Sequence, residues 1–185
     1  GVSILLPLFG VDLDIATVLL AMIPFFTILF TPLFGALVDK VGKATLWMIV
    51  GSAMVLVSHL IITFAPQGEP MYAYIAIALL GIGYSLVPSA MWPSVPKIIP
   101  EKNLGTAYSL IYWVQNLGMW AVPIYVGRIF KKEITEAGNI SQGITAAIHA
   151  EYVFIFLGIV AIATAMMLYH SSRRHPELRL DEPAQ

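Results

Sequence analysis

The amino-acid sequence predicts an all-α, polytopic membrane protein, and two properties of the chain predict it together. Hydrophobic residues make up 58% of the 185 residues and charged residues only 11%, whereas a soluble domain carries roughly 25% charged residues. Several stretches without charge follow one another, each longer than the roughly 18 residues that indicate a transmembrane helix. They predict five transmembrane helices within residues 15–172, at about 15–38, 44–66, 70–98, 103–128 and 151–171.

The two ends of the chain differ from these helices. Residues 1–11 are uncharged and mostly apolar but too few to cross a bilayer. They show no basic region or small-residue cleavage pattern of a signal peptide, so we expect the end of a truncated transmembrane helix. Residues 173–185 are charged and include Pro176 and Pro183, which is typical of a frayed tail outside the membrane.

The basic residues predict the orientation in the membrane. Seven lie on one side of the predicted bundle and three on the other: Lys40, Lys43, Lys97, Lys102, Arg173, Arg174 and Arg179 against Arg128, Lys131 and Lys132. The positive-inside rule makes the first side cytoplasmic, so the C-terminus is expected in the cytoplasm. The connection from Arg128 to Glu151, which mixes charges with Gly138, Asn139, Ser141 and Gly143, is expected to be an exposed polar loop.

Composition also excludes several classes of function. A net charge of -1 and the lack of a basic run with interleaved aromatics predict no nucleic-acid partner. The absence of cysteine excludes cysteine-based metal or redox sites. The predicted spans contain no paired carboxylates, histidine cluster or activated nucleophile. We therefore expect no enzyme, no catalytic residue, no metal and no cofactor, and as partners the lipid bilayer and a small-molecule substrate.

The distribution of polar side chains predicts which helices line a cavity, because polar groups in lipid must face protein or water. On a helical wheel, residues 103–128 place polar and aromatic side chains on one side and aliphatic ones on the other. Residues 70–98 repeat this pattern and contain three prolines, which loosen a helix and are tolerated beside a cavity. We expect 15–38, 70–98 and 103–128 to be inner helices and the other two outer ones. The candidate cavity residues are Tyr84, Trp92, Tyr108, Tyr112, Gln115 and Asn116.

Two alternatives stay open for such polar residues. Small and polar side chains on membrane helices also serve helix packing alone, through close approach and interhelical hydrogen bonds. His59, the only imidazole well inside a predicted span, could relay protons. Because the charge-free stretches hold no carboxylate to partner it, an interhelical hydrogen bond is the expected role. Any acid that couples transport to protons is then expected outside this sequence.

One motif lies at the cytoplasmic end of the first predicted span, where the chain reads Gly35-Ala-Leu-Val-Asp39-Lys40-Val-Gly42-Lys43. Gly35 would let a neighbouring helix come close, and Gly42 permits a left-handed turn. Asp39 can accept hydrogen bonds from a helix N-terminus or pair with a base. An ordinary connecting loop is the alternative. The motif resembles the G-x-x-x-D-x-x-G-[RK] signature of the major facilitator superfamily, found between helices two and three and again between eight and nine.

This resemblance implies a fold and a mechanism. The chain would be the C-terminal six-helix half of a twelve-helix major facilitator fold, its first helix truncated, with residues 1–11 as the end of helix seven. Such a half rocks against an N-terminal six-helix half to expose a central site alternately to each side. Gly35, Asp39, Gly42 and Lys43 would govern the conformational equilibrium, and the candidate cavity residues would contact the solute.

A narrower resemblance rests on the two most polar helices. It is carried by Gly83-Tyr84-Ser85, Trp92-Pro93, Pro100-Glu101, Leu104-Gly105-Thr106-Ala107-Tyr108 and Gln115-Asn116-Leu117-Gly118. These segments resemble a branch of the superfamily that holds lysosomal dipeptide uniporters and microbial relatives, although Pro88, Trp113 and Trp120 depart from it. The resemblance implies secondary-active or facilitative transport of a small organic solute, dipeptide-like or amino-acid-like, in the cell (inner) membrane or alternatively the lysosomal one. The competing hypothesis is a non-transporting scaffold or receptor on the same fold.

Overall fold

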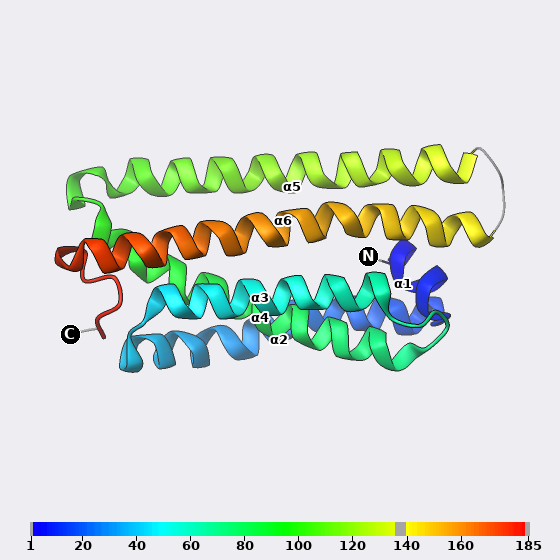
Figure 1. Ribbon diagram of the computed structural model, residues 1–185, viewed down its shortest axis with the longest axis horizontal. Helices are drawn as coiled ribbons and strands as arrows, with labels where there is room; N and C mark the ends of the chain where they lie inside the picture. Colours follow the sequence, from blue (N-terminus) through cyan, green and yellow to red (C-terminus); the bar gives the residue numbers. More distant parts are fainter. Residues whose placement is uncertain (1, 136–139, 184–185) are drawn as a thin grey trace.

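A computed structural model describes residues 2–135 and 140–183, which fold into an all-helical bundle. Its helices are α1 (Val2–Phe9), α2 (Leu13–Val41), α3 (Ala44–Phe64), α4 (Pro70–Ile98), α5 (Leu104–Thr135) and α6 (Ile140–Arg174), with short 3-10 turns η1 (Glu101–Asn103) and η2 (Pro176–Leu178). The five long helices lie side by side, with α5 at one edge, α6 next to it, and α2 and α4 at the opposite edge beyond α3 (Figure 1).

The bundle has two ends, which we name after glycines in its connections. At the Gly42 end the α2–α3 connection meets the C-terminal tail; at the Gly68 end the α3–α4 connection meets α1 (Figure 1). The Gly68 backbone N–H donates to the Leu8 carbonyl at 2.9 Å. Leu5 and Phe9 of α1 are each only 1% exposed, because α1 packs against α2 and α6.

Within residues 2–135 and 140–183, four segments are long and apolar enough to cross a membrane: Leu13–Val41, Ala44–Phe64, Pro70–Ile98 and Gly143–Arg174. α5 is as long as these but less apolar, since it contains tyrosines, tryptophans and side-chain amides. A helix at 103–128 is present, while its role as a fifth transmembrane span stays a prediction. α4 continues through Pro88, Pro93 and Pro96 without a break in its helical course.

Small residues bring α3 and α4 into close contact. A Cβ atom placed on Gly83 would lie 2.8 Å from the Gly51 carbonyl oxygen, and one on Gly51 would lie 3.0 Å from that of Gly83. The Ser58 hydroxyl adds an interhelical hydrogen bond to the Ala76 carbonyl at 2.7 Å. Membrane helices associate through such close approach and hydrogen bonding because lipid supplies no hydrophobic drive between them. α3 also packs against α6 on another side. It therefore joins the pair α2 and α4 to the pair α5 and α6.

The expected exposed loop between Arg128 and Glu151 is wrong. α5 continues to Thr135 and α6 begins at Ile140, and Ala146, Ala147 and Ala150 are fully buried. Charge alone does not end a helix, because exposed basic side chains are good helix formers. Gly138 and Asn139 of that prediction lie outside the described residues.

The expected frayed tail is also wrong for the residues up to Pro183. After α6 the chain turns back through η2 towards the start of α3 (Figure 1). Leu180 is only 1% exposed, and the carbonyls of Leu180 and Glu182 accept hydrogen bonds from the Lys97 ammonium at 3.4 and 2.9 Å. Apolar burial and several hydrogen bonds therefore hold a segment whose prolines and charges predicted disorder.

Candidate functional site

Three of the candidate cavity residues form an aromatic cluster between α4 and α5. The Trp92 ring stacks on the Tyr112 ring with centroids 5.0 Å apart, and the Tyr108 ring lies 5.8 Å from Trp92. The Tyr108 hydroxyl also donates a long hydrogen bond to the Trp92 carbonyl at 3.5 Å. Tyr112 is 53% exposed, so the cluster presents a ring surface that a solute can stack on.

The other three candidates do not join this cluster. Gln115 and Asn116 are exposed on α5, and the Asn116 amide donates to the Tyr112 carbonyl one turn earlier at 2.7 Å. Tyr84 lies about two turns before Trp92 on α4 and lines a different pocket. The sequence named all six as candidates to line a cavity. The structure groups Trp92 with Tyr108 and Tyr112, and places Tyr84 in the lining of a different pocket.

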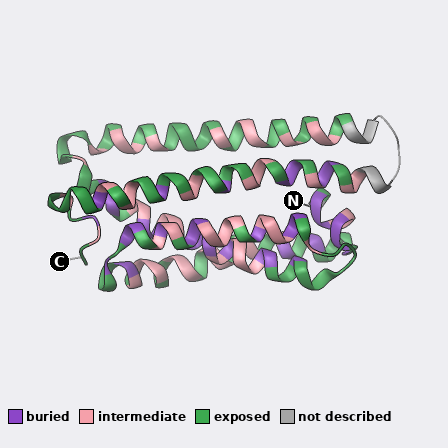
Figure 2. Ribbon diagram, viewed as in Figure 1, coloured by how far each residue is buried: buried purple, intermediate pink, exposed green. Residues whose placement is uncertain are grey.

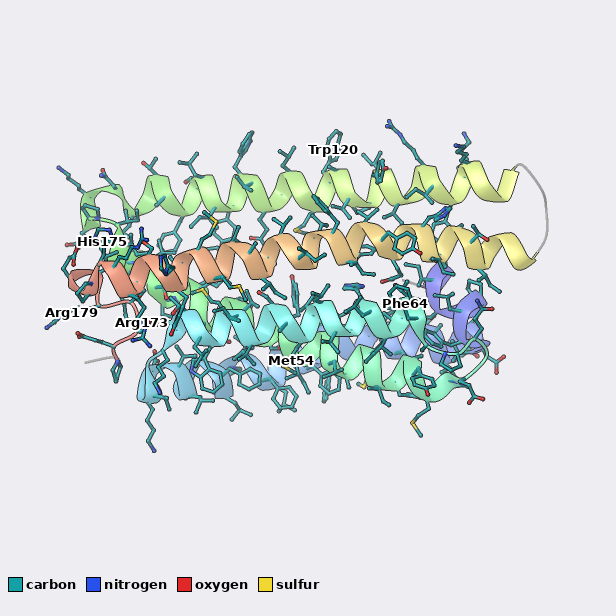
Figure 3. The ribbon with its side chains drawn as sticks, viewed as in Figure 1. Met54, Phe64, Trp120, Arg173, His175 and Arg179 are labelled. Carbon is teal, nitrogen blue, oxygen red and sulfur yellow. The ribbon has the colours of Figure 1, made fainter. Side chains whose placement is uncertain are left out.

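α5 has one half-buried face and one exposed face. The half-buried residues lie on its aliphatic side, where α5 packs chiefly on α6, while other aliphatic residues of that side, such as Leu110, are exposed: half-buried are Ala107, Ile111, Gly118 and Ala121. Most of the helix is exposed (Figure 2), and Trp120 points away from α6 (Figure 3). The exposed aromatic rings of α5, those of Tyr112, Trp113 and Trp120, leave surface available for stacking.

The motif at the Gly42 end has a distinctive backbone. Gly42 has a φ of 69°, and Lys43 a φ of 58° and ψ of 40°, so the positive φ expected at Gly42 is present. A Cβ atom on Gly42 would overlap the Asp181 carbonyl oxygen. Glycine is therefore required there both by its φ and by the close approach of the tail.

The other two motif residues have looser surroundings. A Cβ atom on Gly35 would meet nothing within 4 Å, so the expected close approach of a helix at Gly35 does not occur in the part of the chain described. Asp39 is exposed, and no hydrogen bond or ion pair joins it to another described residue. A different acid accepts hydrogen bonds from the N-terminus of α3.

That acid is Asp181 of the tail, which sequence reasoning did not single out. One Asp181 carboxylate oxygen accepts hydrogen bonds from the Thr45 backbone N–H at 2.9 Å and from its hydroxyl at 2.8 Å. The other oxygen accepts one from the Ser172 hydroxyl at 2.9 Å. The Asp181 carbonyl accepts the Lys43 backbone N–H at 2.8 Å. A carboxylate at the first turn of a helix satisfies free N–H groups and complements the helix dipole.

A second carboxylate overturns the expectation for His59. Nδ1 of His59 lies 2.7 Å from Oε2 of Glu151, and the two side chains are only 12% and 3% exposed. The expectation that no acid partners His59 is wrong because α6 begins well before Glu151 and carries this residue into the interface with α3. The helical spacing of buried Ala146, Ala147 and Ala150 is the sequence signal that could have revealed it.

The tail contains a second histidine–glutamate pair, with different surroundings. Nδ1 of His175 lies 2.8 Å from Oε1 of Glu177, and these side chains are 57% and 66% exposed. Hydrogen bonding from the backbone, followed by that from His175, holds the pKa of Glu177 below its ordinary value. Among residues 2–135 and 140–183, no group of three or more His, Cys, Asp or Glu side chains is placed to hold a metal ion.

The helical bundle, its candidate spans and the glycine-rich motif at the Gly42 end define a class of protein. The Major Facilitator Superfamily model matches residues 1–123, and the chain belongs to this family of membrane transporters. It is a non-enzymatic family, and its match covers α1 to α4 and the first part of α5.

Similarity to individual proteins is narrower. The chain is 44% identical over 99 residues to the lysosomal dipeptide transporter MFSD1 of Mus musculus and 42% identical over 99 residues to that of Homo sapiens. Each match covers 54% of this chain and 20% of the relative, so the chain spans about a fifth of the length of these relatives. No solved structure gives a significant match.

Proposed function

We propose that this chain forms one half of a transporter that moves a small organic solute across a membrane by alternating access. The observation that supports the proposal most directly is the aromatic cluster of Trp92, Tyr108 and Tyr112, which lies beside an exposed polar face of α5. In the family, a second six-helix half would face this surface. We propose that the missing partner is the N-terminal half of the same transporter and that the solute binds between the two halves.

Dipeptides or amino-acid-like solutes are the proposed substrate class. The relatives named above are dipeptide transporters, and the proposed wall offers rings for stacking together with the neutral amides of Gln115 and Asn116. Peptide groups form hydrogen bonds with such amides, and apolar side chains pack against aromatic rings. The charged ends of a dipeptide would be matched mainly by the other half, because the cluster residues carry no formal charge.

We also propose a role for the Gly42 end. Gly35, Asp39, Gly42 and Lys43 would control the balance between the two access states, with Asp39 free to pair with a group of the other half. The excess of basic residues at this end favours a cytoplasmic location for it and for the C-terminus. The membrane would be the cell (inner) membrane or, as in the relatives, the lysosomal one.

The proposal is tested by uptake of a radiolabelled dipeptide, alanyl-alanine, into liposomes that contain the full-length transporter. Tyr108→Ala and Asn116→Ala are expected to lower uptake by about tenfold each, since loss of a stacking or hydrogen-bonding group costs roughly 1–2 kcal/mol. Leu110→Ala is the matched control, because Leu110 is 59% exposed on the aliphatic side of α5.

Normal uptake by both site variants, with folded protein at the level of the control, would refute the site assignment. The same liposomes separate transport from the competing scaffold or receptor function. A scaffold would bind its partner yet leave alanyl-alanine outside the vesicles at every concentration.

A further inference from the structure

The His59–Glu151 pair lies in the interface between α3 and α6, away from the aromatic cluster. The imidazole of His59 is held on two sides by α6, because the Glu151 carboxylate is 2.7 Å away and the Phe154 ring stacks on it with centroids 5.0 Å apart and planes 10° apart. Both contacts come from the same helix, three residues apart. The protonation state of the His59 imidazole is therefore linked directly to the packing of α6 on α3.

The surroundings of the pair are apolar. Both residues line a cavity of about 420 Å³ whose remaining walls are mainly isoleucine and leucine side chains of α1, α2, α3 and α4. Tyr84 is the only other titratable side chain among the described residues that line it. The basic groups Arg128 and Lys132 of α5, with His149 of α6, line a separate pocket. Among the described residues that line the cavity beside the pair, there is no lysine or arginine.

Proton binding changes the net charge of this pair. A neutral imidazole beside a carboxylate has a net charge of about -1, and one added proton, shared between Nδ1 of His59 and Oε2 of Glu151, brings the net charge to zero. An uncompensated charge in apolar surroundings is costly. Histidine is the side chain whose charge ordinarily changes between about pH 5 and 8. A pair without net charge is therefore the less costly form in such an interface.

We propose that His59 and Glu151 form a proton-binding site whose occupancy sets the packing of α3 on α6 and thereby makes transport depend on pH. The proton comes from water at the Gly68 end and enters through His59, the more exposed of the two. In alternating access each half moves as a rigid body, which requires that α3 stays packed on α6. Transport is therefore fast when the pair is protonated and this packing is firm, and it slows when the pair is deprotonated. This inference rests on the proposed transport function.

The test is a pH profile of alanyl-alanine uptake by the full-length transporter in liposomes, with the pH varied on the Gly68 side only. Wild-type uptake is expected to fall by about fivefold or more between about pH 5 and 8. The double variant His59→Gln/Glu151→Gln keeps a neutral hydrogen-bonding pair, so its uptake should vary by less than about twofold over that range. His175→Gln, which alters the exposed pair of the tail, should keep the wild-type profile.

A double variant with the wild-type profile overturns the proposal, and so does a His175→Gln variant that loses it. A second measurement needs no transport and uses the wild-type protein, so a misfolded variant does not affect it. Nitrogen-15 NMR of the histidine-labelled wild-type protein follows the His59 signal, which is assigned by its loss in the variant His59→Gln. This signal is expected to shift over the pH range in which uptake changes, and a constant signal refutes the proton site. If the wild type moves no alanyl-alanine at any pH, the proposed substrate class fails, and the NMR titration alone decides on the proton site.

Discussion

The two histidine–glutamate pairs use the same atoms at nearly the same distance, 2.7 Å for His59–Glu151 and 2.8 Å for His175–Glu177. They differ in exposure: 12% and 3% for the first pair, 57% and 66% for the second. In water an ion pair is screened and pays side-chain entropy, so it stabilises little. In an apolar interface each partner depends on the other to compensate its charge. Burial, and not distance, therefore gives only the first pair an energetic role.

The largest expected effect comes from removing one partner of the buried pair. Under the acidic conditions in which the proposed site holds its proton, Glu151→Ala leaves a charged His59 without its carboxylate and opens a space beside Phe154. Breaking a buried ion pair in this way costs about 3–5 kcal/mol. The effect is checked by thermal unfolding of the full-length protein in detergent, followed by circular dichroism. Glu177→Ala is the matched control and should unfold as the wild type does. Equal unfolding temperatures for the two variants would remove the distinction between the pairs.

An intermediate effect is expected at Asp181, a partly buried carboxylate whose partners are a backbone N–H and two hydroxyls. Asp181→Ala loses a helix cap and two further hydrogen bonds, which together cost about 2 kcal/mol. None of these partners changes charge between about pH 6 and 8, so the loss should be the same at both values. Unfolding scans of the variant at both pH values test this. A loss that disappears at one of them would contradict the assignment of partners.

The smallest effect is expected at Glu177. Because its pKa is lowered in the folded protein, any stabilisation is present above the ordinary pKa of glutamate and is lost as the pH falls through the lowered value. At neutral pH that contribution is fully present, yet its exposure keeps it small. Glu177→Gln should therefore show no measurable change in unfolding temperature at neutral pH. A clear drop there would mean that the tail depends on this pair more than its exposure suggests.

Much of the architecture could be predicted from the sequence, because a long charge-free stretch in a membrane protein satisfies its backbone hydrogen bonds by forming a helix. The helix starting at residue 44 and the whole of α4 fall where the pattern places them. The polar face of residues 103–128 brought Tyr108 and Tyr112 together on one side, where they meet Trp92. Tyr84 could not be placed this way. It lies eight residues before Trp92, a rise of about 12 Å along the helix.

The buried carboxylates were missed for a physical reason. Charge marks the ends of the predicted helices, so the pattern places Glu151 at the border between a loop and a helix, and Asp181 in a tail. In the structure each is held by partners far away in the sequence: His59 is 92 positions from Glu151 and Thr45 is 136 positions from Asp181. A periodicity within one segment carries no information about such pairings. Both acids fix a segment to α3. Glu151 of α6 does so near the C-terminal end of α3, and Asp181, which follows α6, does so at the N-terminal end of α3.

The cap that Asp181 places on α3 also has a consequence for biosynthesis. The first turn of α3 is synthesised before the carboxylate that satisfies its backbone, because Asp181 follows Thr45 by 136 positions in the sequence. A membrane helix can insert on its hydrophobicity alone, so α3 would enter the bilayer with its first turn served only by water or lipid headgroups. Its final packing waits until Asp181 has left the ribosome. A deletion of residues 176–183 would then appear as a defect at residues 42–45, which Asp181 contacts through its carboxylate and its carbonyl.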